Sequence, residues 1–140
     1  MGFEFSVVVE SIPALLEGAR LTWFITILGI VGGMIFGVLA GLGRLAGTES
    51  LGEAPHGIYK SVSVLIRYVS GGYVETIRGT PIIVQAMFIY FAFPMLVKGL
   101  LDIERFRIEA LTAAVITIII NAGAYIAEIV RGSVMSVNKG

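Results

Sequence analysis

The chain has 140 residues, of which 56% are hydrophobic and only 14% charged, and its mean hydropathy is +0.92. This composition is typical of a membrane protein and unusual for a soluble domain. Ten basic residues balance ten acidic ones, so the net charge indicates neither nucleic acid nor an acidic macromolecule as a partner. The absence of cysteine excludes disulfides and thiolate sites, and the single histidine, His56, leaves little for a zinc site. We therefore expect no metal and no cofactor.

Three stretches without charged residues are long enough to cross a bilayer. They cover residues 21–43, 79–97 and 110–127, which are 23, 19 and 18 residues. A spanning helix needs about 20 mostly apolar residues. The first stretch follows an acidic N-terminal segment and lacks a small-residue cleavage pattern, so it is not a signal peptide. The sequence therefore predicts an all-α membrane protein with three transmembrane helices.

The first span carries a glycine at every fourth position: Gly29, Gly33, Gly37 and Gly41. Residues four apart share a helix face, so these glycines form a shallow groove that another helix can approach closely. The groove indicates either ordinary packing inside one membrane domain or a surface for dimerisation or sliding. The sequence leaves both interpretations open.

A polar loop and an amphipathic segment follow. The loop, 47–57, has no Lys and Ser/Thr where a phosphate-binding loop requires them, so no nucleotide site is expected. In the segment after it, apolar side chains fall within an arc of about 120° and basic ones lie opposite. This predicts a helix in the inner membrane interface. The pair Gly71-Gly72 weakens the helix and can split it in two. The apolar positions are Ile58, Val62, Leu65, Ile66, Val69, Tyr73 and Ile77, and the basic ones are Lys60, Arg67 and Arg78.

The second span starts with residues that favour a helix N-terminus. Gly79 breaks the preceding segment, Thr80 is expected to N-cap a new helix, and Pro81 to take its first position, where the missing N–H costs nothing. Aromatic residues gather towards the far end of this span, where Pro94 is expected to loosen or stop the helix. The motif reads Arg78-Gly79-Thr80-Pro81, and no charge follows it until Lys98.

Two polar side chains, Gln85 and Asn121, lie within the second and third spans. A polar side chain in a span faces protein or a water-filled path. Each residue is therefore a candidate either for an interhelical hydrogen bond or for contact with a substrate path. At the inner end of the third span, Glu128 and Arg131 lie three apart on one helix face and are expected to pair.

The basic residues predict the orientation. Six of the ten lie between the first two spans or after the third, which places the N-terminus outside and the C-terminus inside. The expected divisions are a periplasmic segment at 1–19, span one at 20–44, a cytoplasmic loop with the amphipathic helix at 45–79, span two at 80–98, a periplasmic loop at 99–109, span three at 110–130 and the start of a cytoplasmic coupling loop at 131–140.

Two of these segments resemble a known family. The run from Glu75 to Pro94 resembles the Arg-Gly-Thr-Pro segment of polar amino-acid uptake permeases, the membrane subunits of bacterial ABC importers. The run 121–140 is similar to their Gly-Ala-Tyr-x-Ala-Glu-x-x-Arg-Gly motif at the inner end of the third span. The residues matching this second motif include Tyr125, Glu128, Arg131 and Gly132. The resemblance extends from Pro13 onward and is nearest to glutamine permeases, although the stretch 47–66 looks longer than usual for the family.

The resemblance implies the N-terminal part of a five-span permease fold, because members of the family continue with a loop that docks on the ATPase and two more spans. It identifies a fragment, with the ATPase-coupling residues beyond Gly140. The implied function is that of a permease subunit in the bacterial inner membrane. It would form part of the translocation path of an ATP-driven importer for a polar amino acid, with glutamine as the first candidate.

The implied partners are a second permease subunit in a homodimer or heterodimer, ATP-binding subunits, a periplasmic amino-acid-binding protein and the lipid bilayer. No nucleic acid and no catalytic residue are expected, and ATP hydrolysis is expected on a separate subunit. The alternative is a small membrane interaction protein that associates through its glycine-rich helix and transports nothing.

Overall fold

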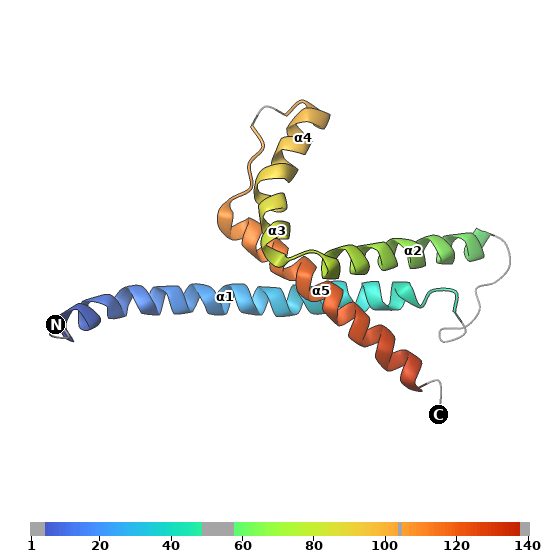
Figure 1. Cartoon of the computed structure of the whole chain (residues 1–140), viewed down its shortest axis with the longest axis horizontal. Helices are drawn as coiled ribbons and strands as arrows, with labels where there is room; N and C mark the ends of the chain where they lie inside the picture. Colours follow the sequence, from blue (N-terminus) through green and yellow to red (C-terminus); the bar gives the residue numbers. More distant parts are fainter. Residues whose placement is uncertain (1–4, 49–57, 104, 138–140) are drawn as a thin grey trace.

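The computed structural model describes residues 5–48, 58–103 and 105–137, and every regular element in these ranges is helical. The elements are α1 (Phe5–Arg44), α2 (Ile58–Gly79), α3 (Ile82–Met87), the π-helical turn η2 (Phe88–Ala92), α4 (Phe93–Leu101) and α5 (Ala110–Val137). Figure 1 shows α1 as a long rod that α5 crosses, with α2 beside its C-terminal half and the α3–α4 arm turned away from it.

Three helical segments are long and apolar enough to cross a membrane: Val7–Arg44, Ile82–Leu101 and Ala110–Val137. Large apolar side chains on them are exposed, as on Trp23 at 70% and Ile129 at 66%, which suits a surface that faces lipid. The predicted all-α membrane fold with three spans is confirmed. Two helices extend beyond the predicted spans. Helix α1 begins at Phe5, and α5 continues to Val137, into the segment predicted as the start of the coupling loop.

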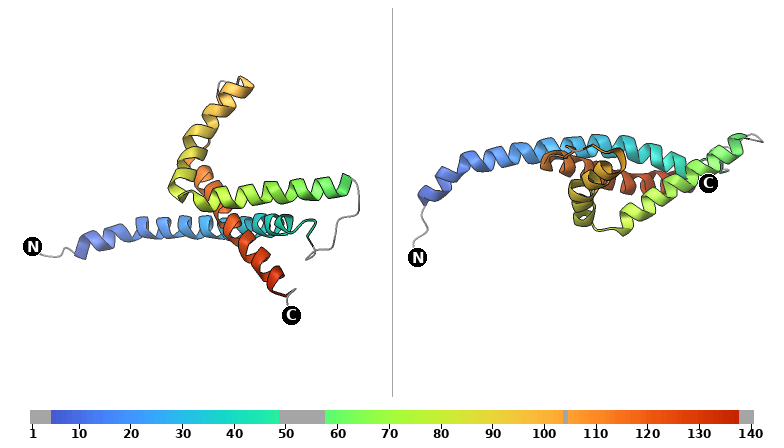
Figure 2. Two further views of the ribbon diagram at one scale, coloured as in Figure 1. Left: turned by 45° about the vertical axis from the view of Figure 1, so that its right-hand side comes forward. Right: turned by 90° about the horizontal axis from the view of Figure 1, so that it is seen from above.

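The main packing contact joins α1 to α5, and all four ladder glycines of α1 are buried in it. A Cβ atom added to Gly29 would lie 2.5 Å from the Cγ2 of Ile118, and one added to Gly41 would lie 2.8 Å from the Cβ of Val130. The contact thus advances in the same sense along both helices, so α1 and α5 run parallel. First and third spans of a chain that crosses three times must run in the same direction, and both views of Figure 2 keep α5 against α1.

The closest approach lies near the middle of α5, where small residues face one another. A Cβ on Gly33 would lie 2.8 Å from the Cβ of Ala122, and a Cβ on Gly123 would lie 3.2 Å from the Cβ of Phe36. Any larger side chain at these positions would push the helices apart. The structure therefore places a helix of the same chain in the glycine groove, which is the arrangement of ordinary packing within one domain.

Helix α2 is continuous through Gly71 and Gly72, so the pair does not split it. Its C-terminal part packs on the other helices, and Val74 is fully buried there. Its N-terminal part is open, since the apolar side chains of Leu65 and Val69 are 63% and 64% exposed. The helix is amphipathic as predicted, with only one end of its apolar face covered by the described residues.

The start of the second span differs from the prediction. Helix α3 begins at Ile82, so the expectation that Pro81 takes its first position is wrong. Pro81 precedes the helix in an extended conformation (φ −56°, ψ 138°), without a side-chain cap. The N-cap role expected for Thr80 is wrong, because its hydroxyl instead donates to the carbonyl of Thr76 at 2.8 Å. The cause is that α2 stays helical up to Gly79 and keeps this carbonyl, four residues back, within reach.

Pro94 loosens the second span and does not stop it. The π-helical turn η2 ends two residues before it, and the N–H of Phe93 donates to the carbonyl of Phe88, five residues back. In a regular α-helix the ring of Pro94 would clash with the carbonyl four residues earlier, and a wider turn relieves that clash. The span then continues as α4 to Leu101, and Asp102 ends it in the left-handed conformation (φ 53°, ψ 36°).

We expect Gly37→Ala to lower stability and Gly18→Ala, in the same helix, not to lower it. Alanine favours a helix over glycine by about 1 kcal/mol, and nothing described lies within 4 Å of a Cβ on Gly18. At Gly37 the new methyl would lie 2.5 Å from the Cβ of Ile126, and overpacking of this kind costs about 1–3 kcal/mol. Thermal unfolding in detergent should show a lower Tm for Gly37→Ala and an equal or higher one for Gly18→Ala. The same Tm for both variants would mean that α5 does not cover the ladder.

Candidate functional site

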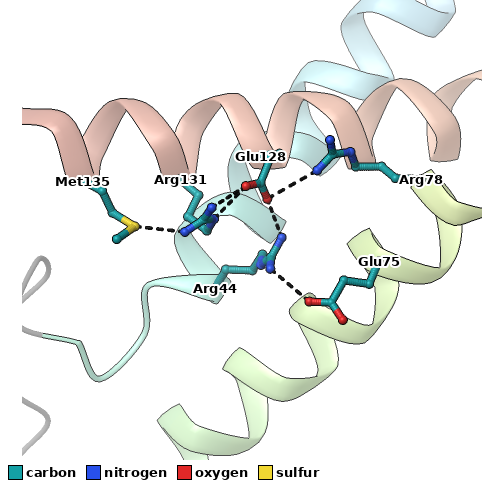
Figure 3. A network of polar contacts seen from close by, with 6 residues as sticks. All are labelled: Arg44, Glu75, Arg78, Glu128, Arg131 and Met135. Carbon is teal, nitrogen blue, oxygen red and sulfur yellow. Dashed lines mark hydrogen bonds and ion pairs between the residues drawn. The ribbon is translucent and has the colours of Figure 1, made fainter.

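The densest polar contacts lie where the uncharged stretches of α1 and α5 end. Arg44 is the last residue of α1, Arg78 lies one residue before the end of α2, and Glu128 follows the uncharged part of α5. Figure 3 shows these three side chains pointing toward one another, with Arg131 beside them. We call the set the Glu128 cluster: Arg44, Glu75, Arg78, Glu128 and Arg131.

Both carboxylate oxygens of Glu128 are used. Its Oε2 accepts a hydrogen bond from the Nη1 of Arg44 at 2.5 Å and lies 3.7 Å from the Nη1 of Arg78. Its Oε1 accepts hydrogen bonds from the Nε of Arg131 at 3.0 Å and from the Nη2 of the same side chain. The predicted pair of Glu128 with Arg131 forms, and two arginines from other helices join it.

The exposed fraction of the side chains distinguishes the ion pair of Arg44 with Glu128 from its weaker pair with Glu75. The side chains of Arg44 and Glu128 are 17% and 25% exposed, whereas Glu75, which Arg44 also contacts at 3.3 Å, is 74% exposed. Water screens an exposed ion pair, so the contact with Glu75 adds little. Arg44 and Arg78 also lie at the C-terminal ends of their helices, where the helix dipole favours a cation. Glu128 therefore ties α5 to the C-terminal ends of α1 and α2.

The residues of the family motif lie around this cluster. The guanidinium of Arg78 lies 5.4 Å from the ring centroid of Tyr125, which gives a cation–π contact, and Nη1 of Arg131 contacts the sulfur of Met135 at 3.0 Å. Gly132 has open space, since no described atom lies within 4 Å of a Cβ placed there. The motif residues of α5 thus contact the C-terminal ends of both α1 and α2.

The structure brings the two polar candidates of the spans together. The Nδ2 of Asn121 donates to the Oε1 of Gln85 at 3.4 Å, a long hydrogen bond between α5 and α3. The Nε2 of Gln85 donates to the carbonyls of Ile77 and Thr80, both at 2.8 Å. The Ile77 carbonyl lies in the last turn of α2 and also accepts the N–H of Thr80 at 3.3 Å, and the Thr80 carbonyl lies directly after the helix, so the amide of Gln85 pairs with carbonyls that the helix ladder leaves open. Gln85, only 6% exposed, therefore joins α2, α3 and α5.

Tyr73 provides a second tie between α2 and α5. Its hydroxyl donates to the carbonyl of Ile120 at 2.7 Å, and burial raises the pKa of the phenol, so it remains a donor at neutral pH. Gly123 leaves room for it, because a Cβ there would lie 2.8 Å from the hydroxyl oxygen. The sequence pattern identified Tyr73 only as part of an apolar face, and its spacing carries no signal of this contact.

A pocket of about 580 Å³ lies beside Gln85, between the end of α2, the α3–α4 arm and α5. Eight of its lining side chains are apolar, and its polar groups are those of Thr76, Thr80 and Gln85. Asn121 does not line it. A polar molecule in this pocket would find hydrogen-bonding groups only near the junction of α2 and α3.

Within the described ranges, no group of three or more His, Asp or Glu side chains is placed to hold a metal ion. His56 and Lys139 lie outside the described residues. The arrangement of the described residues is one of helix junctions and polar ties, and its chemistry is that of ion pairing and hydrogen bonding.

We expect Glu128→Gln to lower the free energy of unfolding by about 1–3 kcal/mol, because it removes a charged acceptor and leaves three arginines close together. Glu75→Gln, the matched change on an exposed carboxylate, should alter it by less than about 0.5 kcal/mol. Denaturant titration in detergent micelles compares the two variants. Equal effects from both would contradict the central place of Glu128.

Comparisons with known proteins identify several relatives of the chain. No family model matches the chain. It is 45% identical over all 140 residues to the glutamine transport system permease protein GlnP of Escherichia coli K12, covering 100% of this chain and 54% of that protein. It is 33% identical over 128 residues to the L-cystine transport system permease protein TcyB of Bacillus subtilis, covering 91% of this chain and 45% of that protein. It is 27% identical over 140 residues to the arginine transport system permease protein ArtQ of the same organism, covering 100% of this chain and 54% of that protein.

Among solved structures, an amino acid ABC transporter crystallised with histidines matches with a TM-score of 0.72 and 29% identity, over 94% of this chain and 51% of that one. The chain spans about half the length of the curated relatives that it matches. The resemblance indicated by the sequence motifs is therefore confirmed: along its whole length, the chain is similar to the permease proteins of amino-acid ABC transporters.

Proposed function

We propose that this chain is part of a permease subunit of an ATP-driven importer for a polar amino acid, with glutamine as the first candidate, in the bacterial inner membrane. The observation that carries the proposal is the 45% identity to a glutamine permease along the entire chain. The permeases named for arginine and cystine are 27% and 33% identical, which favours glutamine among the three. The three apolar helices supply the membrane part that such a subunit requires.

The proposed role is to form one side of the translocation path and to perform no covalent chemistry. ATP hydrolysis belongs, in this proposal, to separate ATP-binding subunits. A second permease subunit completes the path, and a periplasmic binding protein delivers the amino acid.

Within the path, we assign different roles to the two polar residues of the spans. Gln85 is a structural tie, because its amide group is buried and pairs with two carbonyls at the end of α2. Asn121 is the candidate for contact with substrate, because it is half-buried and its one described hydrogen bond is long, at 3.4 Å. A weak hydrogen bond is easily exchanged for one to a passing polar molecule.

A chimaeric permease tests the proposed function. Residues 1–140 replace the matching part of the E. coli glutamine permease in cells that lack their own copy, and uptake of radiolabelled glutamine is measured. We expect uptake that unlabelled glutamine inhibits more strongly than arginine or cystine does. A chimaera that reaches the membrane and assembles with its ATP-binding subunit, yet takes up none of these amino acids, would favour the alternative of a membrane interaction protein.

In the same chimaera, Asn121→Leu should lower the rate of glutamine uptake while assembly with the ATP-binding subunit stays normal. The substitution keeps the bulk of the side chain and removes its donor and acceptor, a loss of about 1–3 kcal/mol wherever a partner is left unpaired. Gln85→Leu is the control and should reduce assembly itself. Normal uptake with Asn121→Leu, or a loss of assembly with it, would contradict the path role of Asn121.

The proposed orientation places residues 45–79 in the cytoplasm and the loop 99–109 in the periplasm. Because the natural chain has no cysteine, single cysteines at Ser50 and Asp102 report on it directly. Ser50 lies outside the described residues, and Asp102 ends α4. In intact cells an impermeant thiol reagent should label Asp102→Cys and spare Ser50→Cys. The reverse pattern would overturn the orientation.

A further inference from the structure

Helix α2 contains two adjacent glycines, although no described residue packs closely enough against them to exclude a larger side chain. A Cβ on Gly71 or Gly72 would meet nothing within 4 Å, whereas a Cβ on any ladder glycine of α1 would collide with α5. Glycine inside a helix costs about 1 kcal/mol relative to alanine, so this pair weakens α2 without an internal contact that requires it. What the glycines provide is open space beside the helix.

That space is a groove of about 450 Å³ between α2 and the ends of α1 and α5. Besides the glycines, it is lined by Arg44, Arg67, Tyr68, Glu75 and Arg131. Three guanidinium groups face one carboxylate, so the lining carries a net charge of +2. Figure 3 shows the side chain of Arg44 between Glu75 of α2 and Glu128 of α5, with Arg131 next to Glu128.

Of the three arginines that line the groove, Arg67 is the one that does not belong to the Glu128 cluster. It forms no ion pair with any residue that the structure describes, and its Cζ lies 5.9 Å from the ring centroid of Tyr68. Arg44 and Arg131 already share Glu128, and Glu75 is largely exposed. An anion in the groove would therefore meet one unshared cation and two partly shared ones.

The groove lies at the depth of lipid headgroups. Arg44 directly follows the uncharged stretch 21–43, and Arg131 comes four residues after the uncharged stretch 110–127. The ends of these stretches mark the boundary between hydrocarbon and water, where lipid phosphates lie. Guanidinium groups bind phosphate through paired hydrogen bonds, and basic pockets between membrane helices bind anionic lipid headgroups.

We propose that the groove over Gly71 and Gly72 is a binding site for the phosphate headgroup of an anionic phospholipid, held by Arg67 and Arg131. The missing side chains let the headgroup approach the backbone of α2. A protein helix is a poorer occupant, because it would bury the unshared charge of Arg67 away from water without a partner. The proposal requires only that the chain lies in a bilayer, and it is independent of the substrate and of transport.

Native mass spectrometry of the purified full chain in detergent tests the proposal with added phosphatidylglycerol or phosphatidylcholine. We expect phosphatidylglycerol to bind at least tenfold more tightly. Arg67→Gln should weaken its binding about fivefold, the effect of one arginine near a membrane surface. Lys60→Gln, a loss of the same charge on the same helix outside the groove, should change binding less than twofold. Equal binding of the two lipids, or equal effects of the two variants, would overturn the proposal.

Gly72→Leu separates the site from a general effect of charge or folding. A Cβ at this position meets no described atom within 4 Å, and leucine raises the helix propensity of α2. The side chain should therefore occupy the groove and abolish binding of phosphatidylglycerol while the Tm does not fall. Unchanged lipid binding in this variant would contradict the proposed site. Excess inorganic phosphate should leave the lipid bound, and displacement by phosphate alone would mean that the groove takes a free anion and not a lipid.

Discussion

The close approach of α1 and α5 is the constraint on which the rest of this structure depends. Four glycines spaced one turn apart leave α1 without side chains along the contact, so α5 can lie in parallel register against its backbone. This register also decides which polar groups meet. Gly41 lies against Ala127 and Val130, and Arg44, three residues further along α1, reaches Glu128, which lies between those two residues on α5. A shift of one helical turn, about 5.4 Å, would separate the two charges.

The third element, α2, is held to the same surface by polar ties at three points. Tyr73 reaches the carbonyl of Ile120, Arg78 approaches Glu128, and the carbonyls of Ile77 and Thr80 accept hydrogen bonds from Gln85. Gly123 serves both contacts of α5, because its missing side chain leaves space for α1 on one side and for the tyrosine hydroxyl on the other. The apolar side chains in the N-terminal part of α2 stay exposed.

Much of this architecture follows from local properties of the sequence. Uncharged stretches identify the spans, the fourfold glycine spacing identifies a face for close packing, and Glu128 and Arg131 are neighbours on one helix turn. The partners Arg44 and Glu128 lie 84 residues apart, and only the register of two helices brings them together. The cap expected at Thr80 was wrong for a similar reason, since the continuation of α2 to Gly79 decides where that hydroxyl donates. Helix propensity alone suggested a break at Gly71-Gly72, whereas α2 is continuous there and its buried Val74 follows the pair.

A cross-link between α1 and α5 tests the central claim most directly. A Cβ on Gly29 lies 3.6 Å from the Cβ of Ile118, within the range of about 3.5–4.5 Å that a disulfide spans. Because the natural chain has no cysteine, Gly29→Cys with Ile118→Cys can be oxidised in membranes with a lipid-soluble catalyst and read by gel mobility. The account predicts a cross-link within one chain, and none when Ile118→Cys is replaced by Ile116→Cys, which points into the apolar pocket beside Gln85. Equal cross-linking of both pairs, or a link only between two chains, would contradict it.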